Sequence, residues 1–310
     1  MIPQEIISEL QKAKAKRLFV QFPEGLMLKI QAIVKELEAK GFQTVLCLDV
    51  TFGACDVRED ESKRLKCDAI LQIGHSNFGV KTTIPVVYWD YLIDVDPTPI
   101  LEKEFSKIEN FDSFGLITQL QFVNTIPIAK KFLEEKGKKV FVGKSRTEKY
   151  PGQILGCRLE AGKVVEDKID CFLCISSGKF YAQGMALATD KPVFNLNIEY
   201  GRIESMEPVK RKLQKIIAWN KGQFKEARNV GILVTWKLGQ LGLPYMLKEK
   251  LERMGKSVYI FAMDEIVPEK LEGLKLDFLV CTGCPRIGTD DIDRYKIPIV
   301  DSSELAELLA

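Results

Sequence analysis

The sequence predicts an α/β protein of three related domains, each a small parallel sheet flanked by helices. Apolar runs typical of buried strands alternate with segments whose apolar residues follow helical spacing. The same order of segments occurs three times at intervals of about 100 residues, which is the size of a domain rather than of a solenoid repeat. We therefore expect domains at residues 1–99, 100–204 and 205–310 of the 310-residue chain.

The first third of the chain shows the pattern most fully. Helical spacing of apolar residues predicts two helices, at Met1–Lys16 and Leu26–Leu37, and Gly41 caps the second. Apolar runs between turn residues predict strands at Arg17–Phe22, Thr44–Val50, Asp68–Ile73 and Ile84–Trp89.

The middle and last thirds repeat this order. The middle third predicts a helix at Ile126–Gly137 and strands at Phe114–Thr118, Lys139–Gly143, Asp170–Ser176 and Pro192–Ile198. A connecting helix at about Glu207–Ala227 leads into the last third. That third predicts a helix at Pro244–Gly255 and strands at Val230–Thr235, Val258–Met263, Asp277–Thr282 and Ile297–Asp301.

Three kinds of residue mark corresponding positions in the three thirds. The helix endings LEAKG, LEEKG and LERMG finish at Gly41, Gly137 and Gly255, the third strands begin at Asp68, Asp170 and Asp277, and the fourth strands carry Pro85, Pro192 and Pro298. Three such matches in one order are hard to obtain by chance. Parallel α/β sheets bind ligands in the loops after the carboxyl ends of their strands, so functional residues are expected there.

Composition excludes several classes of protein. The 45 basic and 43 acidic residues leave a net charge of +2, which argues against a dedicated nucleic-acid binder. No apolar run approaches the ~20 residues of a membrane helix, and the N-terminus lacks the apolar core of a signal peptide. We therefore expect a cytoplasmic protein whose eight cysteines serve metal, redox or core roles rather than disulfides. A single histidine, His75, excludes a histidine-rich metal site.

Four of the cysteines fall where core packing is expected, and a fifth, Cys67, stands alone. Cys171 and Cys174 lie three apart in a predicted strand, so their side chains point to opposite faces and cannot easily share a metal. Cys47 lies within another predicted strand, Cys67 precedes one without companions, and Cys281 ends one.

The other three cysteines lie in loops after strands, one in each third. They are Cys55 in DVTFGACD, Cys157 in YPGQILGCR and Cys284 in CTGCPRIG. Alanine or glycine precedes the first two, which lets a bulky ligand approach the backbone. Three thiolates at one centre are one short of a closed zinc site, and they also suit a 4Fe–4S cluster with one open iron.

The loop that carries Cys284 has its own chemistry. Pro285 constrains its backbone, and Arg286 places a permanent cation beside the cysteine, which favours thiolate over thiol. The alternative is a strand that ends in a turn with a cysteine and a surface arginine.

Six motifs occur in a fixed order along the chain. They are FPEGL (Phe22–Leu26), DVTFGACD (Asp49–Asp56), IGHS (Ile73–Ser76), GQILGC (Gly152–Cys157), GQ (Gly239–Gln240) and CPRIG (Cys284–Gly288). Together they resemble the archaeal diphthamide-synthesis enzymes, the 2-(3-amino-3-carboxypropyl)histidine synthases of translation elongation factor 2, over essentially the whole chain.

The resemblance implies a fold, a cofactor and a reaction. It implies a homodimer of chains with three α/β domains, and a 4Fe–4S cluster at the centre between them, held by Cys55, Cys157 and Cys284. Cys281 is an alternative ligand. The cluster, reduced by an external electron donor, is expected to pass an electron to S-adenosylmethionine. Cleavage then gives methylthioadenosine and a 3-amino-3-carboxypropyl radical, which adds to a histidine of elongation factor 2. Neither nucleic acid nor a membrane is expected as a partner.

Four residues in the same motifs are candidates for contact with S-adenosylmethionine: Gly53, His75, Gln240 and Arg286. Arginine suits bidentate binding of the methionyl carboxylate, although an interdomain salt bridge is equally consistent with its position. Gln240 is expected either to bond the amino-acid end or to be solvated. For Glu24, a role in capping a helix is favoured over a role in the pocket.

Two other functions remain open from the sequence. One is a non-catalytic, zinc-stabilised α/β scaffold that uses Cys281 and Cys284 with Cys171 and Cys174. The other is a nucleotide-binding enzyme without metal, which is disfavoured because no glycine-rich phosphate motif follows a predicted strand.

Overall fold

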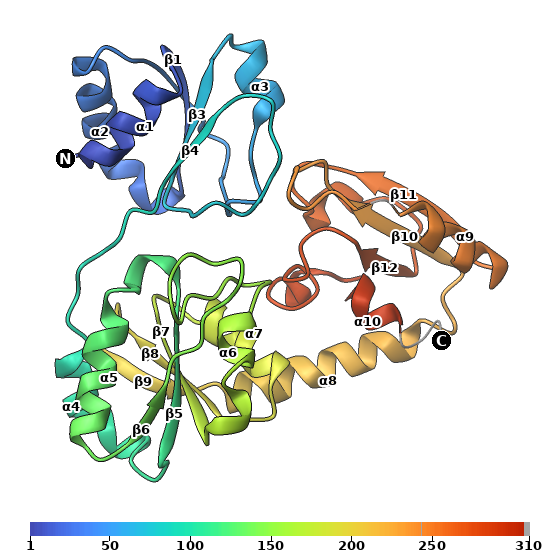
Figure 1. Cartoon of the computed structure of the whole chain (residues 1–310). Helices are drawn as coiled ribbons and strands as arrows, with labels where there is room; N and C mark the ends of the chain where they lie inside the picture. The colour runs from blue at the N-terminus through green and yellow to red at the C-terminus, as the bar shows by residue number, and fades with distance from the viewer. Residues whose placement is uncertain (243, 307–310) are drawn as a thin grey trace. The chain divides into compact units, whose positions relative to one another are not determined.

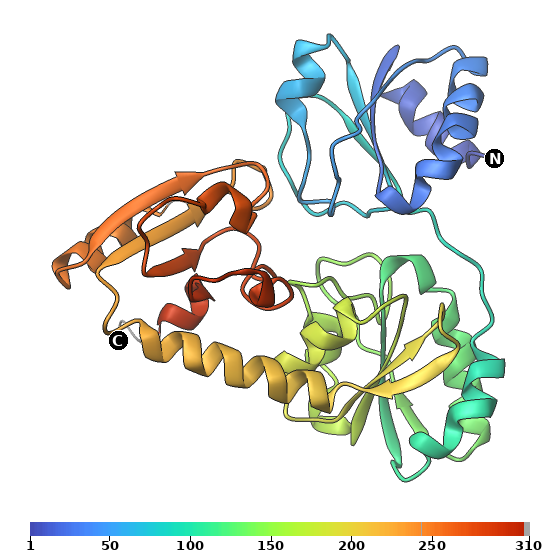
Figure 2. The same cartoon turned by 180° about the vertical axis from the view of Figure 1, so that it is seen from behind.

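The computed structural model describes residues 1–242 and 244–306. It contains three sheets, each mostly or wholly parallel, with helices packed against them (Figures 1 and 2). By its packing the chain forms two compact units. Unit 1 comprises Met1–Asp94, Thr147–Lys149 and Lys237–Gly239, and unit 2 comprises Val95–Arg146, Tyr150–Trp236 and Gln240–Ala310. The three domain boundaries expected from the sequence stay a prediction.

Unit 1 holds one parallel sheet in the order β2-β1-β3-β4. Its strands are β1 (Arg17–Gln21), β2 (Gln43–Leu46), β3 (Ala69–Ile73) and β4 (Val86–Trp89), and its helices are α1 (Gln4–Lys12), η1 (Glu24–Leu26), α2 (Met27–Ala39) and α3 (Glu59–Arg64). Alternate residues of one strand enter different clusters, since Leu18 and Val20 pack in one and Phe19 in the other. The sheet is therefore covered on both faces, as parallel sheets usually are.

The second sheet, in unit 2, has the order β6-β5-β7-β8-β9. Its strands are β5 (Ser113–Thr118), β6 (Lys139–Phe141), β7 (Cys171–Ser176), β8 (Val193–Asn197) and β9 (Arg202–Ser205). The surrounding helices are α4 (Thr98–Glu104), η2 (Phe105–Lys107), η3 (Leu120–Phe122), α5 (Thr125–Glu135), α6 (Glu160–Lys163), η4 (Glu166–Lys168) and α7 (Phe180–Ala188). β9 pairs antiparallel with β8 and was not predicted.

The third sheet, also in unit 2, has the order β11-β10-β12-β13. Its strands are β10 (Asn229–Val234), β11 (Ser257–Ala262), β12 (Phe278–Cys281) and β13 (Ile299–Asp301). The helices are α8 (Glu207–Gln223), which joins it to the second sheet (Figure 2), then α9 (Tyr245–Arg253), η5 (Pro268–Leu271), η6 (Ile292–Arg294) and α10 (Ser302–Ala306).

The predicted fold class is confirmed, and every strand expected from the sequence is present. Several boundaries were wrong by a few residues. The second strand ends at Leu46 rather than Val50, so Cys47 follows it, and α8 ends at Gln223 rather than Ala227. Among the described helices, none is long and apolar enough to cross a membrane.

The repeated glycines end helices in the same way. Gly41, Gly137 and Gly255 have φ of 92°, 77° and 80°, which is the left-handed region that glycine adopts without strain. In each case the next residue donates its N–H back to a leucine carbonyl near the helix end, as at Phe42 to Leu37 (3.2 Å). This is the Schellman arrangement that satisfies the last carbonyls of a helix.

The repeated aspartates and prolines join neighbouring strands. Asp277 Oδ2 accepts hydrogen bonds from the backbone N–H groups of Arg228 (3.0 Å) and Asn229 (2.7 Å), and Asp68 and Asp170 bind the start of the first strand of their own sheets in the same way. The carbonyls of Pro85, Pro192 and Pro298 each accept an N–H from the third strand. These residues recur because they fix the same strand register three times.

Asp277→Ala tests this role of the aspartates. The hydrogen bond from the Asn229 N–H is the main cause that lowers the pKa of Asp277, so the carboxylate stabilises the fold. Because Asp277 is exposed, we expect a loss of only about 1 kcal/mol in urea unfolding at pH 7. The lowered pKa means that this difference is complete above the ordinary aspartate value of about 3.9 and shrinks as the pH falls below it. Asp293→Ala, which removes only an exposed ion pair with Lys212, is the control, and equal effects of the two changes would contradict the role.

Candidate functional site

Three cysteines lie in loops that follow strands. Cys55 lies between β2 and α3, Cys157 between β6 and α6, and Cys284 after β12. Cys157 is exposed, and Cys55 and Cys284 are partly buried. Cys55 belongs to unit 1, and the other two belong to unit 2. Within either unit taken alone, the described residues contain no group of three His, Cys, Asp or Glu side chains suited to a metal ion.

The other five cysteines are buried free thiols. Cys171 and Cys174 enter two different core clusters on opposite faces of the second sheet, as the alternation of strand side chains predicted. Burial raises the pKa of the Cys174 and Cys281 thiols to about 12, and it also raises the pKa of Cys47, Cys67 and Cys171. The zinc scaffold, which requires Cys171 and Cys174 at one site, is disfavoured because these two side chains lie on opposite faces of the sheet.

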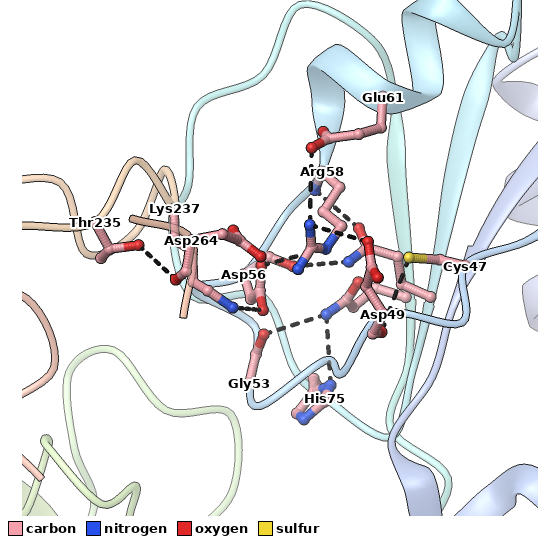
Figure 3. Close-up of polar contacts among 12 residues, drawn as sticks. Cys47, Asp49, Gly53, Asp56, Arg58, Glu61, His75, Thr235, Lys237 and Asp264 are labelled. Atoms are coloured by element: carbon pink, nitrogen blue, oxygen red, sulfur yellow. Dashed lines mark hydrogen bonds and ion pairs between the residues drawn. The ribbon is translucent and has the colours of Figure 1, made fainter. Parts of the chain in front are cut away.

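The loop of Cys55 is built on a buried polar network (Figure 3). Gln21, the last residue of β1, donates from Nε2 to the Asp56 carbonyl (2.9 Å) and accepts from the Arg58 N–H (2.9 Å). The Asp56 carboxylate lies between two buried cations: it pairs with the Lys237 ammonium, and its Oδ1 lies 3.8 Å from Nε of Arg58. Asp56 is 1% exposed, so its charge depends on these partners.

A second glutamine fixes the other side of this loop. Gln72 of β3 donates from Nε2 to the Gly53 carbonyl (3.3 Å) and lies 3.4 Å from Nδ1 of His75. Burial lowers the pKa of His75 to about 4, so its imidazole is neutral at physiological pH. The structure thus brings together two of the four residues predicted to contact S-adenosylmethionine, Gly53 and His75, beside the Cys55 loop.

Arg286 joins the loops of Cys157 and Cys284. Its guanidinium pairs with Asp290, and it donates from Nη1 to the Gly156 carbonyl (3.3 Å) and from Nη2 to the Phe180 carbonyl (2.8 Å). The guanidinium also stacks on the Phe180 ring, 4.1 Å from its centroid. An added Cβ at position 156 would lie 2.4 Å from that ring, so the glycine there lets the ring keep this position. Arg286 is 7% exposed, so the surface arginine considered from the sequence is wrong.

The remaining candidates are placed more simply. Cys281, the alternative ligand, points into the core, and its thiol lies 3.6 Å from the Cys284 carbonyl. Gln240 is partly buried and directly follows Gly239. Glu24 is exposed and is the first residue of η1. The N-cap residue of this helix is Pro23, and no side chain caps it by a hydrogen bond. Contact of Gly53, His75, Gln240 or Arg286 with S-adenosylmethionine stays a prediction.

Comparison with known proteins decides the family. The sequence model of the diphthamide synthesis proteins matches residues 22–310. The chain belongs to this family. It is 29% identical over 310 residues to the 2-(3-amino-3-carboxypropyl)histidine synthase of Pyrococcus horikoshii, covering 98% of this chain and 89% of that protein. It is 27% identical over 315 residues to subunit 1 of the human 2-(3-amino-3-carboxypropyl)histidine synthase, covering 98% and 70%.

Solved structures agree with the family. The crystal structure of Dph2 from Pyrococcus horikoshii matches with a TM-score of 0.89 at 27% identity, covering 100% of this chain and 91% of that one. The structure of the same protein with a 4Fe–4S cluster matches with a TM-score of 0.90, covering 100% and 90%. The resemblance found in the six motifs is therefore confirmed.

Sequence reasoning missed the residues that support the cysteines. Asp56, Lys237 and Asp290 were not singled out, although Asp56 directly follows Cys55 in GACD. Gln21 and Gln72 gave a usable signal, because each is the one polar residue in an otherwise apolar run, LFVQF and AILQI. A buried polar side chain at a strand end needs partners, and such partners are often part of a site.

Arg286→Met tests the bridging role of the arginine. It removes the ion pair with Asp290, which keeps hydrogen bonds from Gln183 and Thr289, and two hydrogen bonds to carbonyls, so we expect a loss of about 2 kcal/mol in urea unfolding of the metal-free protein. Arg286→Lys keeps the positive charge but lacks the planar guanidinium group. We therefore expect a smaller loss of stability than for Arg286→Met. Arg294→Met removes exposed pairs with Glu269 and Asp291 and is the control, expected to leave the urea midpoint unchanged. Full stability of Arg286→Met with a raised KM for S-adenosylmethionine would instead assign Arg286 to the substrate.

The neutrality of His75 is directly measurable, because it is the only histidine. We expect its imidazole NMR signals to stay unchanged from pH 8 to about 5.5 and to titrate near 4, below the ordinary value of about 6.5. Since the unfolded chain binds the proton first, this residue makes stability fall as the pH drops from about 6.5 towards 4. A midpoint at the ordinary value would show that the ring is solvated.

Proposed function

We propose that this protein is a 2-(3-amino-3-carboxypropyl)histidine synthase. It transfers the 3-amino-3-carboxypropyl group of S-adenosylmethionine to a histidine of translation elongation factor 2, the first step of diphthamide synthesis. The observation that carries this proposal is the match over 100% of the chain, at a TM-score of 0.90, to Dph2 with a 4Fe–4S cluster. The relatives that match over nearly the whole chain bear the name of this activity.

The thiolates of Cys55, Cys157 and Cys284 are suited to hold a 4Fe–4S cluster. These are the cysteines outside the buried group, and each lies in a loop where a thiolate is accessible. The glycines at 53 and 156 place no side chain of their own next to the cysteines. Three thiolates leave one iron open for a substrate. When bound, the cluster supplies the electron that cleaves the bond between Cγ of the methionine moiety and sulfur.

The remaining residues bind and orient the substrate. A neutral His75 does not repel the sulfonium cation. Its Nδ1 accepts a hydrogen bond from Gln72 Nε2, which leaves its Nε2–H as a donor. Gly53 allows close approach beside Cys55, and Gln240 bonds the amino-acid end. Contact between Arg286 and the methionyl carboxylate is the weakest of these assignments, because the guanidinium already pairs with Asp290. Orientation of this kind selects which of the three sulfur–carbon bonds breaks.

The proposal extends to the setting of the reaction. The enzyme works in the cytoplasm as a homodimer, with elongation factor 2 as protein substrate and an external electron donor. The transfer reaction proceeds by a radical mechanism. The resemblance in the six motifs supports the homodimer, the protein substrate, the electron donor and the radical mechanism.

Metal analysis and product analysis test the function together. After oxygen-free purification we expect about four iron and four sulfide per chain, as for one 4Fe–4S cluster. With reductant, S-adenosylmethionine and elongation factor 2, methylthioadenosine forms and one histidine gains the aminocarboxypropyl group, which mass spectrometry detects. Zinc in place of iron, or 5′-deoxyadenosine as the main product, would contradict the proposal.

Cysteine variants test the ligands in the same assays. Cys55→Ala, Cys157→Ala and Cys284→Ala should each impair cluster assembly and abolish transfer. Cys47→Ala and Cys171→Ala are the matched controls and should keep the cluster. Loss of iron from Cys171→Ala with retention in Cys157→Ala would show that the ligand set is wrong.

A further inference from the structure

The segment Lys237–Gly239 follows β10 along the chain, yet it packs as part of unit 1. Its start is anchored at Thr235, a residue 1% exposed, whose hydroxyl donates to the Asp264 carbonyl (2.9 Å) (Figure 3). The exposed residues on either side of Lys237, Trp236 and Leu238, contrast with Lys237 itself, which is 6% exposed. A lysine buried between exposed apolar residues reverses the usual pattern, so a specific interaction must hold it there.

That interaction is with the residue next to Cys55. The Lys237 ammonium pairs with the Asp56 carboxylate, and it also lies over the Phe52 ring, 5.0 Å from the centroid. The side chains of Lys237 and Asp56 are 4% and 1% exposed. Because water does not screen such a pair, removal of Lys237 takes away one of the two buried cations that flank the Asp56 carboxylate and loosens the chain that carries it.

The backbone of the same segment holds Cys55 directly. The Gly239 N–H donates to the Cys55 carbonyl (2.8 Å). A Cβ at position 239 would lie 2.6 Å from both Cα and Cβ of Cys55, closer than real contacts allow. Gly239 is therefore required by close approach to the cysteine, and it has no positive φ that would explain it otherwise.

We infer that Lys237 and Gly239 are positioning residues for Cys55. The ion pair to Asp56 and the bond to the Cys55 carbonyl hold the backbone at the cysteine and directly after it, so that its thiolate is presented to the cluster in one orientation. This inference rests on the proposed cluster function and adds that a segment 181 residues away in sequence fixes the first ligand. The conformation of residues 237–239 is thus coupled to the cluster.

Two variants test the inference, each with a matched control. Lys237→Met removes the charge, and Gly239→Ala adds the colliding Cβ without a change of charge. The controls lie side by side in α8: Lys221→Met breaks the pair with Glu304 (2.6 Å), and Gly222→Ala adds a Cβ that meets nothing within 4 Å. Since outer-shell partners typically change metal affinity by 10- to 100-fold, we expect both test variants to release iron to a chelator about tenfold faster than the unmodified protein. The controls should release it at the unmodified rate.

The spectrum of the cluster separates positioning from stability. We expect the reduced Lys237→Met and Gly239→Ala proteins to show altered EPR signals, whereas a purely structural role would lower the melting temperature without a change in spectrum or iron release. Iron release and EPR signals equal to those of the controls would overturn the inference.

A measurement on the metal-free protein keeps the inference independent of the cluster. Hydrogen exchange of residues 52–58 should be faster in both test variants than in the controls. If the unmodified protein binds no iron–sulfur cluster, the proposed function fails, and this exchange then decides whether the segment orders the Cys55 loop. Unchanged exchange at 52–58 would reject that role.

Discussion

A buried cation must be paired, and this constraint organises the loops that carry the cysteines. Lys237 and Arg286 are 6% and 7% exposed, and each is paired with a carboxylate close to it, Asp56 and Asp290. Burial makes such pairs costly to break and strict in geometry. Each pair lies beside a cysteine: Asp56 follows Cys55, and Arg286 also bonds the carbonyl of Gly156, which precedes Cys157. The loops are therefore held by charge where regular strand pairing has ended.

In all three sheets the features at the amino ends of the strands are repeated, whereas the loops at the carboxyl ends differ. At the amino ends of the first strands, Asp68, Asp170 and Asp277 bind backbone N–H groups in the same way. At the carboxyl ends the loops differ in length and sequence, and these loops carry Cys55, Cys157 and Cys284. Parallel strands place all such loops at one edge of their sheet. A repeated framework thus allows each loop to contribute a different functional residue.

The framework was predictable because its signals are local. Apolar runs gave the strands, and the αL glycines and strand-starting aspartates gave the repeat. The elements that were missed lack those signals. α3 (EDESKR) is charged on all sides and α7 (FYAQGMALA) is mostly apolar, so neither shows helical periodicity. β9 lies outside the four-strand repeat and joins β8 as an antiparallel edge. The cysteine loops were found through their motifs, but the pair of Asp56 with Lys237 spans 181 residues and has no periodic signature.

The ion pairs Lys237–Asp56 and Arg286–Asp290 each combine one positive and one negative charge, and this affects how they act on the cysteine loops. Taken from the sequence alone, Arg286 beside Cys284 suggested a cation that stabilises a thiolate. In the structure Asp290 pairs with that guanidinium, and Asp56 pairs with Lys237, so neither pair brings net charge to its loop. The directional bonds that these pairs make to Gly156, Phe180 and Asp56 are local and strong. The two cations therefore hold in place the backbone that carries the cysteines.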